Sequence, residues 1–266
     1  MSTFSQEHLE YLKRIKQNKI FISFFRLFII FLFLIIWEVL SREKIINTFL
    51  FSSPTRIYNT IISLFSNGQL ISNISITIYE VLISFTLATM IGIMFASIMW
   101  FNETLAKIVD PYITIVNSLP KVALGPLIII WVGASINSII FMAITISVFT
   151  TIINIYNSFI NVNHDYIVMI KSFGATKWQV YKKIIFPSNI ENIIATLKIN
   201  ISLSLIGVIM GELLVSKKGI GYLIMYGSQV FNLDLVISSV VILGFISYMM
   251  YLIVDMIESY FRKKRV

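Results

Sequence analysis

Long apolar stretches separated by short polar ones dominate this chain. Six of them are close to the roughly 20 residues that an α-helix needs to cross about 30 Å of hydrocarbon. They cover residues 21–40, 75–100, 111–132, 136–158, 192–213 and 236–257. The pattern therefore predicts an all-α integral membrane protein with six transmembrane helices.

The segment 41–74 interrupts this pattern between the first two spans. It is polar and partly amphipathic, and it contains the turn signals Ser52-Ser53-Pro54 and Asn67-Gly68. We expect it to lie along the outer surface of the membrane rather than to cross it.

Small residues recur at every fourth position of the second span. Ser84, Ala88, Gly92 and Ala96 therefore share one face of that helix. Small side chains allow a second helix to approach closely within a membrane, so this face predicts a packing contact or a subunit interface.

Composition supports the bilayer as the solvent of this chain. Hydrophobic residues make up 57% and charged residues only 13%, and the mean hydropathy is +0.86. Soluble domains carry about a quarter charged residues. The absence of cysteine excludes disulfides, thiolate metal sites and cysteine nucleophiles. Two histidines, His8 and His164, leave little scope for a metal centre.

Positive charge sets the expected orientation. With six spans both termini share one side, which then holds thirteen of the lysines and arginines outside the spans, against five on the other side. Because such residues gather in cytoplasmic loops, both termini should be cytoplasmic. The expected organisation is a cytoplasmic N-terminal segment over 1–20, a transmembrane domain over 21–258 and a basic cytoplasmic tail over 259–266.

Several charged residues fall in or near the apolar spans, where charge is costly. Lys121 stands out because Pro120 and Pro126 remove backbone donors on either side of it, so the third span should bend or break there. Lys121 and Glu212 could line an anionic substrate path. Alternatively Lys121 pairs with Glu212, or with carbonyl groups freed by the prolines, and holds the bundle together, which we favour. The other charges of this kind are Glu38, Glu80, Lys198 and Asp255.

The longest polar interruption covers about 160–190. Apolar spacing predicts a helix over 165–173, which Gly174 stops. Thr176 is a suitable N-cap for a second short helix, which should run to Ile185 before Pro187 ends it. The side chains expected to project from this second helix are Lys177, Trp178, Tyr181 and Lys182.

This segment resembles the signature EAA loop of bacterial ABC importer permeases. That pattern is Gly, nine residues, Ile, any residue, Leu, Pro, and here Gly174, Ile184, Phe186 and Pro187 occupy its positions. Phe186 replaces the usual Leu, and Val168-Met169-Ile170 replaces the Glu-Ala-Ala triplet, which removes any ion pair from the glutamate. The resemblance implies a coupling helix that docks on an ATP-binding subunit. The docking residues would be Gly174, Ala175, Thr176, Lys177 and Trp178.

Two further stretches are similar to the nitrate, sulfonate and taurine branch of these permeases. They are residues 118–133, which include Pro120 and Gly133, and residues 211–224. The resemblance implies a type I importer permease fold, a homodimer, two cytoplasmic ATP-binding subunits and an extracytoplasmic binding protein, in a bacterial plasma membrane. It implies a sulfonate-, taurine- or nitrate-type anion as substrate, or alternatively a vitamin precursor such as a thiamine pyrimidine or riboflavin.

The chain contains no P-loop, so ATP hydrolysis should reside on another polypeptide, and ATP and magnesium should bind there. No catalytic constellation is present, and we expect no cofactor on this chain. An ion-coupled secondary transporter would show repeated halves and deep acidic residues, of which only Glu212 is a candidate. A membrane scaffold would have no need for the Gly174 loop.

Overall fold

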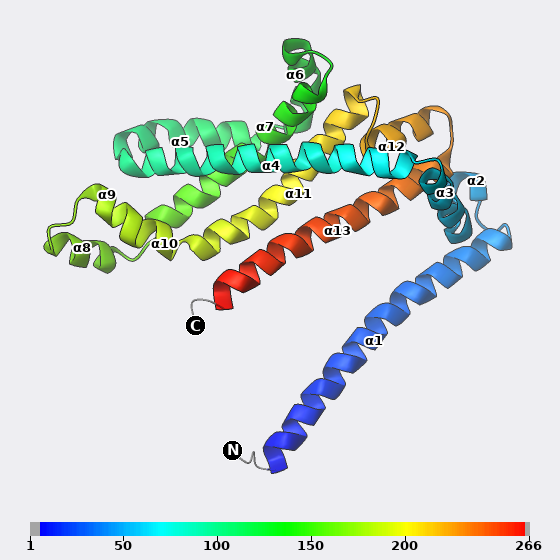
Figure 1. Cartoon of the computed structure of the whole chain (residues 1–266), viewed down its shortest axis with the longest axis horizontal. Coiled ribbons are helices and arrows are strands. Elements are labelled where there is room, and N and C mark those ends of the chain that lie inside the picture. The colour runs from blue at the N-terminus through cyan, green and yellow to red at the C-terminus, as the bar shows by residue number, and fades with distance from the viewer. Residues whose placement is uncertain (1–5, 264–266) are drawn as a thin grey trace.

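The computed structural model describes residues 6–263, which are helical nearly throughout and contain no strand (Figure 1). The five longest helices are α1 (Gln6–Arg42), α4 (Gln69–Phe101), α7 (Ile136–Ile160), α11 (Ile190–Val215) and α13 (Leu233–Lys263). The remaining α-helices are α2 (Thr48–Phe51), α3 (Pro54–Ser66), α5 (Glu103–Ser118), α6 (Gly125–Val132), α8 (His164–Ser172), α9 (Lys177–Val180), α10 (Phe186–Ser188) and α12 (Ile220–Gln229).

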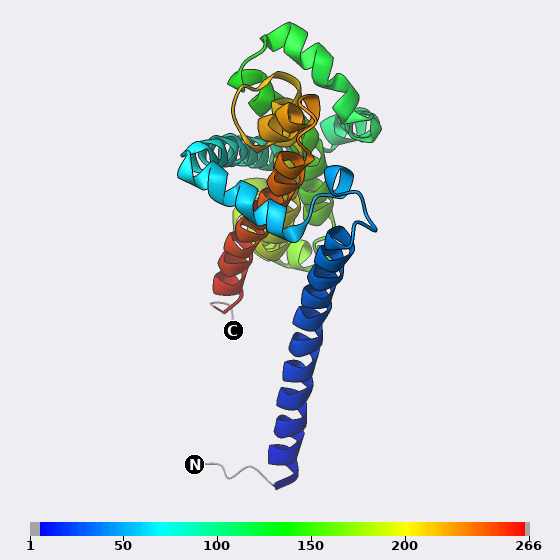
Figure 2. The ribbon, with the colours of Figure 1, turned by 90° about the vertical axis from the view of Figure 1, so that its right-hand side faces the viewer.

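Three helices form the centre of the bundle. α7 packs against both α4 and α11, and α13 packs on α11 and α12. α1 stands away from this bundle in both views and contacts it mainly through α3 (Figures 1 and 2). Most of the described side chains in its apolar part are exposed. Such exposure is expected of a helix that is surrounded by lipid or packed on another chain.

The small-residue face of α4 is the surface on which α7 packs. Ser84, Ala88, Gly92 and Ala96 are all buried. A Cβ atom added at Gly92 would overlap the side chain of Thr151 on α7. The predicted packing contact is therefore confirmed.

A buried amide connects all three central helices. Asn200 of α11 donates a 2.8 Å hydrogen bond to the hydroxyl of Thr89 on α4, and it accepts one of 2.8 Å from Thr151 on α7. All three side chains are buried. Hydrogen bonds of this kind replace water in the interior of a membrane bundle.

The third predicted span, 111–132, is not one straight helix. α5 ends at Ser118, a 3₁₀ turn covers Lys121–Leu124, and α6 then leaves at 87° to α5. The break lies at Pro120, which has no N–H to continue the helix. Pro126 lies in the first turn of α6, where a missing N–H is tolerated, so it does not add a second break. Within residues 6–263, five helices are long and apolar enough to cross a bilayer, or six if this bent pair counts as one span.

The bundle has two ends, which we call the loop end and the far end. The loop end carries α8, α9 and α10, and the far end carries α12 and the connection 216–219. α1 begins and α13 ends toward the loop end (Figure 1). Residues 264–266 of the predicted basic tail lie outside the described residues, and α1 and α13 continue without a break across the predicted boundaries at 20 and 258.

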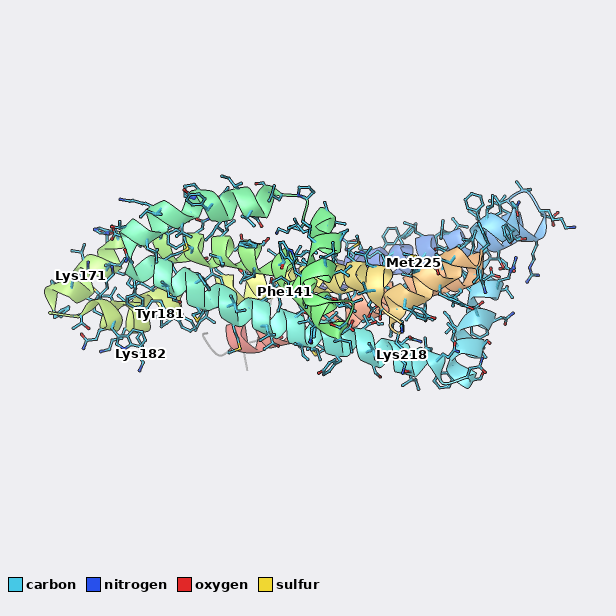
Figure 3. All side chains as sticks on the ribbon, turned by 90° about the horizontal axis from the view of Figure 1, so that it is seen from above. Phe141, Lys171, Tyr181, Lys182, Lys218 and Met225 are labelled. Atoms are coloured by element: carbon cyan, nitrogen blue, oxygen red, sulfur yellow. The ribbon has the colours of Figure 1, made fainter. Side chains whose placement is uncertain are left out.

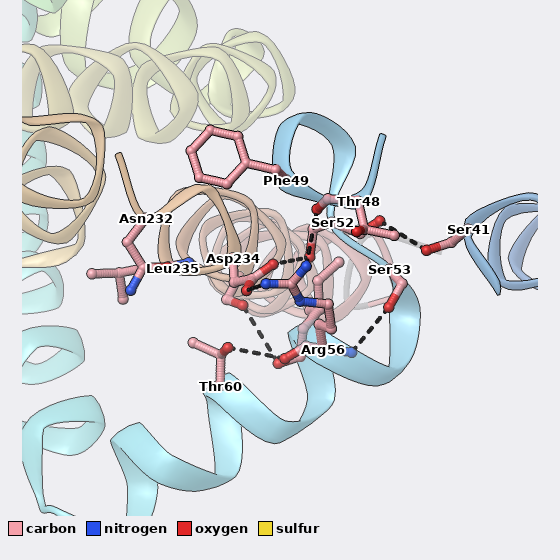
Figure 4. Close-up of polar contacts among 12 residues, drawn as sticks. Ser41, Thr48, Phe49, Ser52, Ser53, Arg56, Thr60, Asn232, Asp234 and Leu235 are labelled. Carbon is pink, nitrogen blue, oxygen red and sulfur yellow. Dashed lines mark hydrogen bonds and ion pairs between the residues drawn. The ribbon is translucent and has the colours of Figure 1, made fainter. Parts of the chain in front are cut away.

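Polar contacts fasten the segment 41–74 to the far end (Figure 4). Ser53 caps α3, and Pro54 opens it, as the turn signal predicts. Arg56 on α3 makes a 2.7 Å ion pair with Asp234 in the first turn of α13, and Ser52 donates a 2.6 Å hydrogen bond to the same carboxylate. α3 is too short to cross a bilayer, in agreement with the expectation for this segment.

Candidate functional site

Gly174 ends α8 in the way that the spacing predicts. Its φ is +79°, a left-handed conformation that favours glycine. The N–H groups of Gly174 and Ala175 bond back to the carbonyls of Lys171 and Ile170, which closes the C-terminus of α8. A Cβ atom at Gly174 would meet nothing within 4 Å, so the backbone angle rather than space requires glycine here.

The helix after this turn begins at a capping box. The hydroxyl of Thr176 accepts from the N–H of Gln179, and the side chain of Gln179 accepts from the N–H of Thr176 at 2.8 Å. The two bonds satisfy N–H groups that the first turn of a helix otherwise leaves free. Thr176 is therefore the N-cap that the sequence predicts.

The predicted end of this helix at Pro187 is wrong. After α9 the chain widens into a π-helical turn over Tyr181–Ile185 and continues through α10 to Ser188. The N–H of Phe186 bonds to the carbonyl of Tyr181, five residues back. Pro187 then lies in the first turn of α10, where the missing N–H of a proline is tolerated. The wider turn accommodates the proline without ending the helical path.

The outer face of residues 164–188 is largely exposed. Phe173 has 83% and Trp178 has 59% of its surface exposed, and Lys171 and Lys182 lie on the outside of this end (Figure 3). Val168 and Met169, which replace the first two residues of the Glu-Ala-Ala triplet, are exposed as well.

The inner face packs against the end of α4, and it corrects one prediction. Tyr181, expected to project outward, is only 9% exposed and is buried with Val180 and Ile185 in a cluster that includes Phe159 of α7. The π-helical turn and the apolar surface at the end of α4 together draw this ring inward. Ile184 is partly buried, Ala175 packs against the same cluster, and the ring of Phe186 lies 6.1 Å from that of Tyr181.

Lys121 lies at the break between α5 and α6 and joins it to α5 and α7. Its Nζ donates 2.8 Å hydrogen bonds to the side chain of Asn117 on α5 and to the carbonyl of Ile146 on α7. Thr150 donates to the same Asn117 oxygen. The expected pair with Glu212 does not form; a backbone carbonyl does hold Lys121, but it comes from α7 rather than from the prolines. Lys121 remains half-buried beside the break.

Glu212 is bound at the far end by two donors. The hydroxyl of Thr77 on α4 and the N–H of Gly221 on α12 each reach one of its carboxylate oxygens at 2.6 Å. Gly219 has a φ of +110°, and a Cβ atom there would overlap the Glu212 carboxylate. The carboxylate therefore occupies the space that a glycine leaves open.

The same face of α4 satisfies two more N–H groups at the start of α12. Asn73 accepts from the N–H of Gly219 at 2.7 Å, and Thr77 accepts from that of Ile220 at 2.9 Å. Glu212 thus belongs to a network that attaches α12 to α4 and α11. Asn73 and Thr77 were not among the predicted site residues; their spacing of four on one face of an apolar helix is the signal that could have identified them.

Of the other charges in the spans, Lys198, Asp255 and Glu38 form ion pairs away from Glu212, whereas Glu80 lies beside the Glu212 carboxyl group. Lys198 of α11 pairs with Asp255 at 2.6 Å and with Glu258, both on α13. Glu38 pairs with Arg42 on α1 at 2.8 Å. Glu80 is fully buried, and neither carboxylate oxygen has a hydrogen-bond partner among the described residues. In the described part of the chain, no group of three or more His, Cys, Asp or Glu could hold a metal ion.

Comparison with known proteins places this architecture in a family. Residues 88–266 match the family model described as the inner membrane component of binding-protein-dependent transport systems. The chain belongs to that family. It is therefore the permease subunit of an ABC importer and a multi-pass membrane protein. The matched residues include the 164–188 segment, Lys121 and Glu212, while α1 to α3 precede them.

Individual relatives agree with this assignment. The chain is 29% identical over 189 residues to the formylaminopyrimidine transport permease protein ThiX of Halalkalibacterium halodurans, with 71% of this chain and 75% of that protein covered. It is 25% identical over 207 residues to the putative aliphatic sulfonates transport permease protein SsuC of Bacillus subtilis, with 78% and 75% covered. Both names fall within the range of substrates that the sequence resemblance implies.

Solved structures share the fold. The permease aligns with a chain of the MetNI methionine ABC transporter in an inward-facing conformation at a TM-score of 0.65 and 18% identity, which covers 73% of this chain and 96% of that one. It aligns with a chain of a bacterial ABC transporter involved in alginate import at 0.65 and 15% identity, covering 94% and 99%. The type I importer permease fold that the resemblance implies is thus supported, with five to six candidate spans.

The Glu212 network generates a stability prediction. Gly219→Ala places a Cβ atom where the Glu212 carboxylate lies, and we expect the displaced bonds to Thr77 and Gly221 to lower the unfolding midpoint of the detergent-purified permease. An unsatisfied buried donor costs about 1–3 kcal/mol. Gly133→Ala is the matched control, because the backbone angles of Gly133 (φ +88°, ψ 161°) are close to those of Gly219 (φ +110°, ψ 170°), but nothing lies within 4 Å of its Cβ position. Equal midpoints for the two variants in thermal unfolding would contradict the network.

Proposed function

We propose that residues 164–188 form the site at which this permease docks on a cytoplasmic ATP-binding subunit. Support comes from the match to the EAA loop spacing and from the geometry of the segment. Gly174 and the capping box at Thr176 set the direction of α9. Phe173 is exposed at a polar end of the bundle, where no lipid would cover it.

The charge distribution supports a cytoplasmic loop end in a bacterial plasma membrane. The loop end holds Lys107 near the start of α5, and Lys171, Lys177, Lys182 and Lys183 in the 164–188 segment. Such residues gather on the cytoplasmic side. Because α1 begins and α13 ends toward the same end, both termini would be cytoplasmic.

A second copy of the permease is the proposed partner within the membrane. The break at Leu119 and Pro120 leaves backbone that is not in a regular helix within a predicted span. Such backbone is tolerated at membrane depth only where protein covers it or where it lines a water-filled cavity. Ile130 and Trp131 of α6 are 75% and 74% exposed beyond this break. Two copies facing each other across α5 and α6 would cover both features and enclose a central path.

The proposed transport cycle uses this arrangement. ATP, bound with magnesium on two ATP-binding subunits, closes those subunits on each other. The docked segments then move, and the two permease bundles rock around the central path. An extracytoplasmic binding protein delivers the solute to the far end. Pro120, Lys121 and Pro126 would line the path; Glu212, held by its network, would shape its outer end.

For the substrate we propose a small anion of the sulfonate, taurine or nitrate type. The relationship to an aliphatic sulfonate permease supports it. So does Lys121, a half-buried cation beside the break. The relationship to a formylaminopyrimidine permease favours a thiamine pyrimidine as the alternative.

Docking can be tested by copurification with the ATP-binding subunit. Gly174→Asp with Ala175→Arg should abolish copurification, because the new side chains strain the left-handed turn and add bulk and charge to the docking face. The control is Gly68→Asp, which places the same residue at a glycine of similar φ, at the far end. If the ATP-binding subunit still copurifies with the doubly substituted permease, the docking assignment is wrong.

The path role of Lys121 is tested by Lys121→Met. A hydrogen bond to a charged group contributes about 1.5–3 kcal/mol. Its loss should therefore reduce anion uptake about tenfold or more. Lys217→Met, at the exposed connection 216–219, serves as the control. Unchanged uptake would refute the path role. If the Lys121→Met permease no longer copurifies with the ATP-binding subunit, Lys121 only holds the bundle together.

The substrate class can be tested by thermal unfolding of the binding protein. We expect the binding protein that copurifies with the permease to melt at a higher temperature with an alkanesulfonate, taurine or nitrate, because ligand binding stabilises the folded state. Stabilisation by formylaminopyrimidine alone would replace the anion proposal with the alternative.

A further inference from the structure

The loop end contains a contact whose role the docking proposal does not explain. Residues 177–181 do not only face outward; their inner side chains attach to the last turns of α4. α8, by contrast, has no buried residues. The contacts that hold the segment to the bundle therefore lie mainly after Gly174.

Tyr181 makes the deepest of these attachments. Its hydroxyl lies 2.7 Å from the hydroxyl of Ser97 on α4. The hydroxyl of Ser97 also donates a 2.6 Å bond to the carbonyl of Ile93, four residues earlier in the helix. A hydroxyl carries one hydrogen, so Tyr181 must be the donor to Ser97. This bond joins the π-helical turn directly to the interior of α4.

Lys177 makes a second attachment at the end of α4. Its Nζ donates a 2.8 Å hydrogen bond to the carbonyl of Phe101, the last residue of the helix, and lies 5.6 Å from the centre of the Trp100 ring. A cation at this position satisfies a carbonyl without a helical partner and opposes the negative end of the helix dipole.

Aromatic rings fill the space between these two bonds. Trp178 stacks on both Phe101 and Tyr181, with ring centroids 5.9 Å and 5.8 Å away, and those two rings are themselves 5.0 Å apart. Tyr181 also lies 5.5 Å from Trp100. Ring pairs at these separations contribute attraction beyond their buried area. Four aromatic side chains, two from α4 and two from the segment, therefore pack as one unit.

We propose that the bonds from Tyr181 to Ser97 and from Lys177 to Phe101, which we call the α4 clamp, make α4 the helix that receives the displacement of the docked segment. The proposal rests on the docking function and specifies its route. α4 hydrogen-bonds to α11 through Thr89 and Asn200, and Thr151 of α7 joins the same amide. At its other end α4 carries Thr77, which bonds Glu212. The single helix α4 thus links the loop end, where the ATP-binding subunit would dock, to the far end.

The clamp is tested by separating docking from coupling. Tyr181→Phe keeps the ring and removes only the bond to Ser97. Because the Tyr181 side chain is buried against α4 and is not part of the exposed docking face, copurification of the ATP-binding subunit and its basal ATP hydrolysis should stay at the wild-type level. Substrate imported per ATP hydrolysed should fall about two- to tenfold, the effect of one hydrogen bond. Ser97→Ala should act in the same way, and Ser97→Thr, which keeps a hydroxyl, should restore the ratio. Tyr58→Phe, exposed on α3, is the control.

The ratio of import to ATP hydrolysis is measured in proteoliposomes at equal amounts of assembled complex, so a change in folding yield alone does not alter it. A wild-type ratio in both Tyr181→Phe and Ser97→Ala would overturn the clamp and leave docking intact. If the wild-type permease fails to bind the ATP-binding subunit, the docking proposal and the α4 clamp proposal are both wrong.

A restored connection gives an independent measurement. The chain has no cysteine, so Ser97→Cys with Tyr181→Cys supplies the only two thiols. This double variant should hydrolyse ATP with little import, and joining the thiols with a short bifunctional reagent should raise import per ATP at least twofold. Import that stays low or falls after linkage would show that this contact must open during the cycle, contrary to the proposal.

Discussion

Hydrocarbon offers no hydrogen-bond partner, so a polar group of this permease within the bilayer is costly unless the protein supplies one. The requirement explains why the described chain is helical and why its polar side chains gather at a few places. Asn200 connects three helices at the centre, Lys121 joins the break in the third span to α5 and α7, and Glu212 joins α12 to α4. Each group is satisfied by a different helix from its own, so the polar groups that are costly in lipid are also the ones that hold the helices together.

The same constraint gives α4 its central position. Its small residues allow α7 to approach, and its polar residues bond to α11, to the start of α12 and to the 164–188 segment. These contacts extend from its first turns to its last. A displacement applied at the loop end would therefore reach the far end through one continuous helix, without passing through the break at Pro120.

Periodicity and spacing were sufficient to predict most of the fold. Apolar length located the long helices, the face of Ser84 and Gly92 predicted a close packing contact, which α7 makes, and Gly174 marked the end of α8. The predictions that failed concern hydrogen-bond partners and local helix geometry, which the hydrophobic pattern does not specify. Lys121 binds Asn117 and α7 rather than Glu212, and Tyr181 turns inward because a π-helical turn accommodates Pro187. Hydrophobic pattern reports that a side chain is buried or exposed, but it does not say which helix will face it.

The central claim is that the face around Phe173 is covered by an ATP-binding subunit. A single cysteine at Phe173, in a chain that has no other, allows that face to be probed directly with a membrane-impermeant thiol reagent. If that subunit covers the face, adding it to the purified permease should slow labelling at this position by at least an order of magnitude. Labelling of a cysteine at Ile45, exposed near the far end, should not change. Equal labelling of Phe173→Cys with and without the ATP-binding subunit would show that the face is not covered.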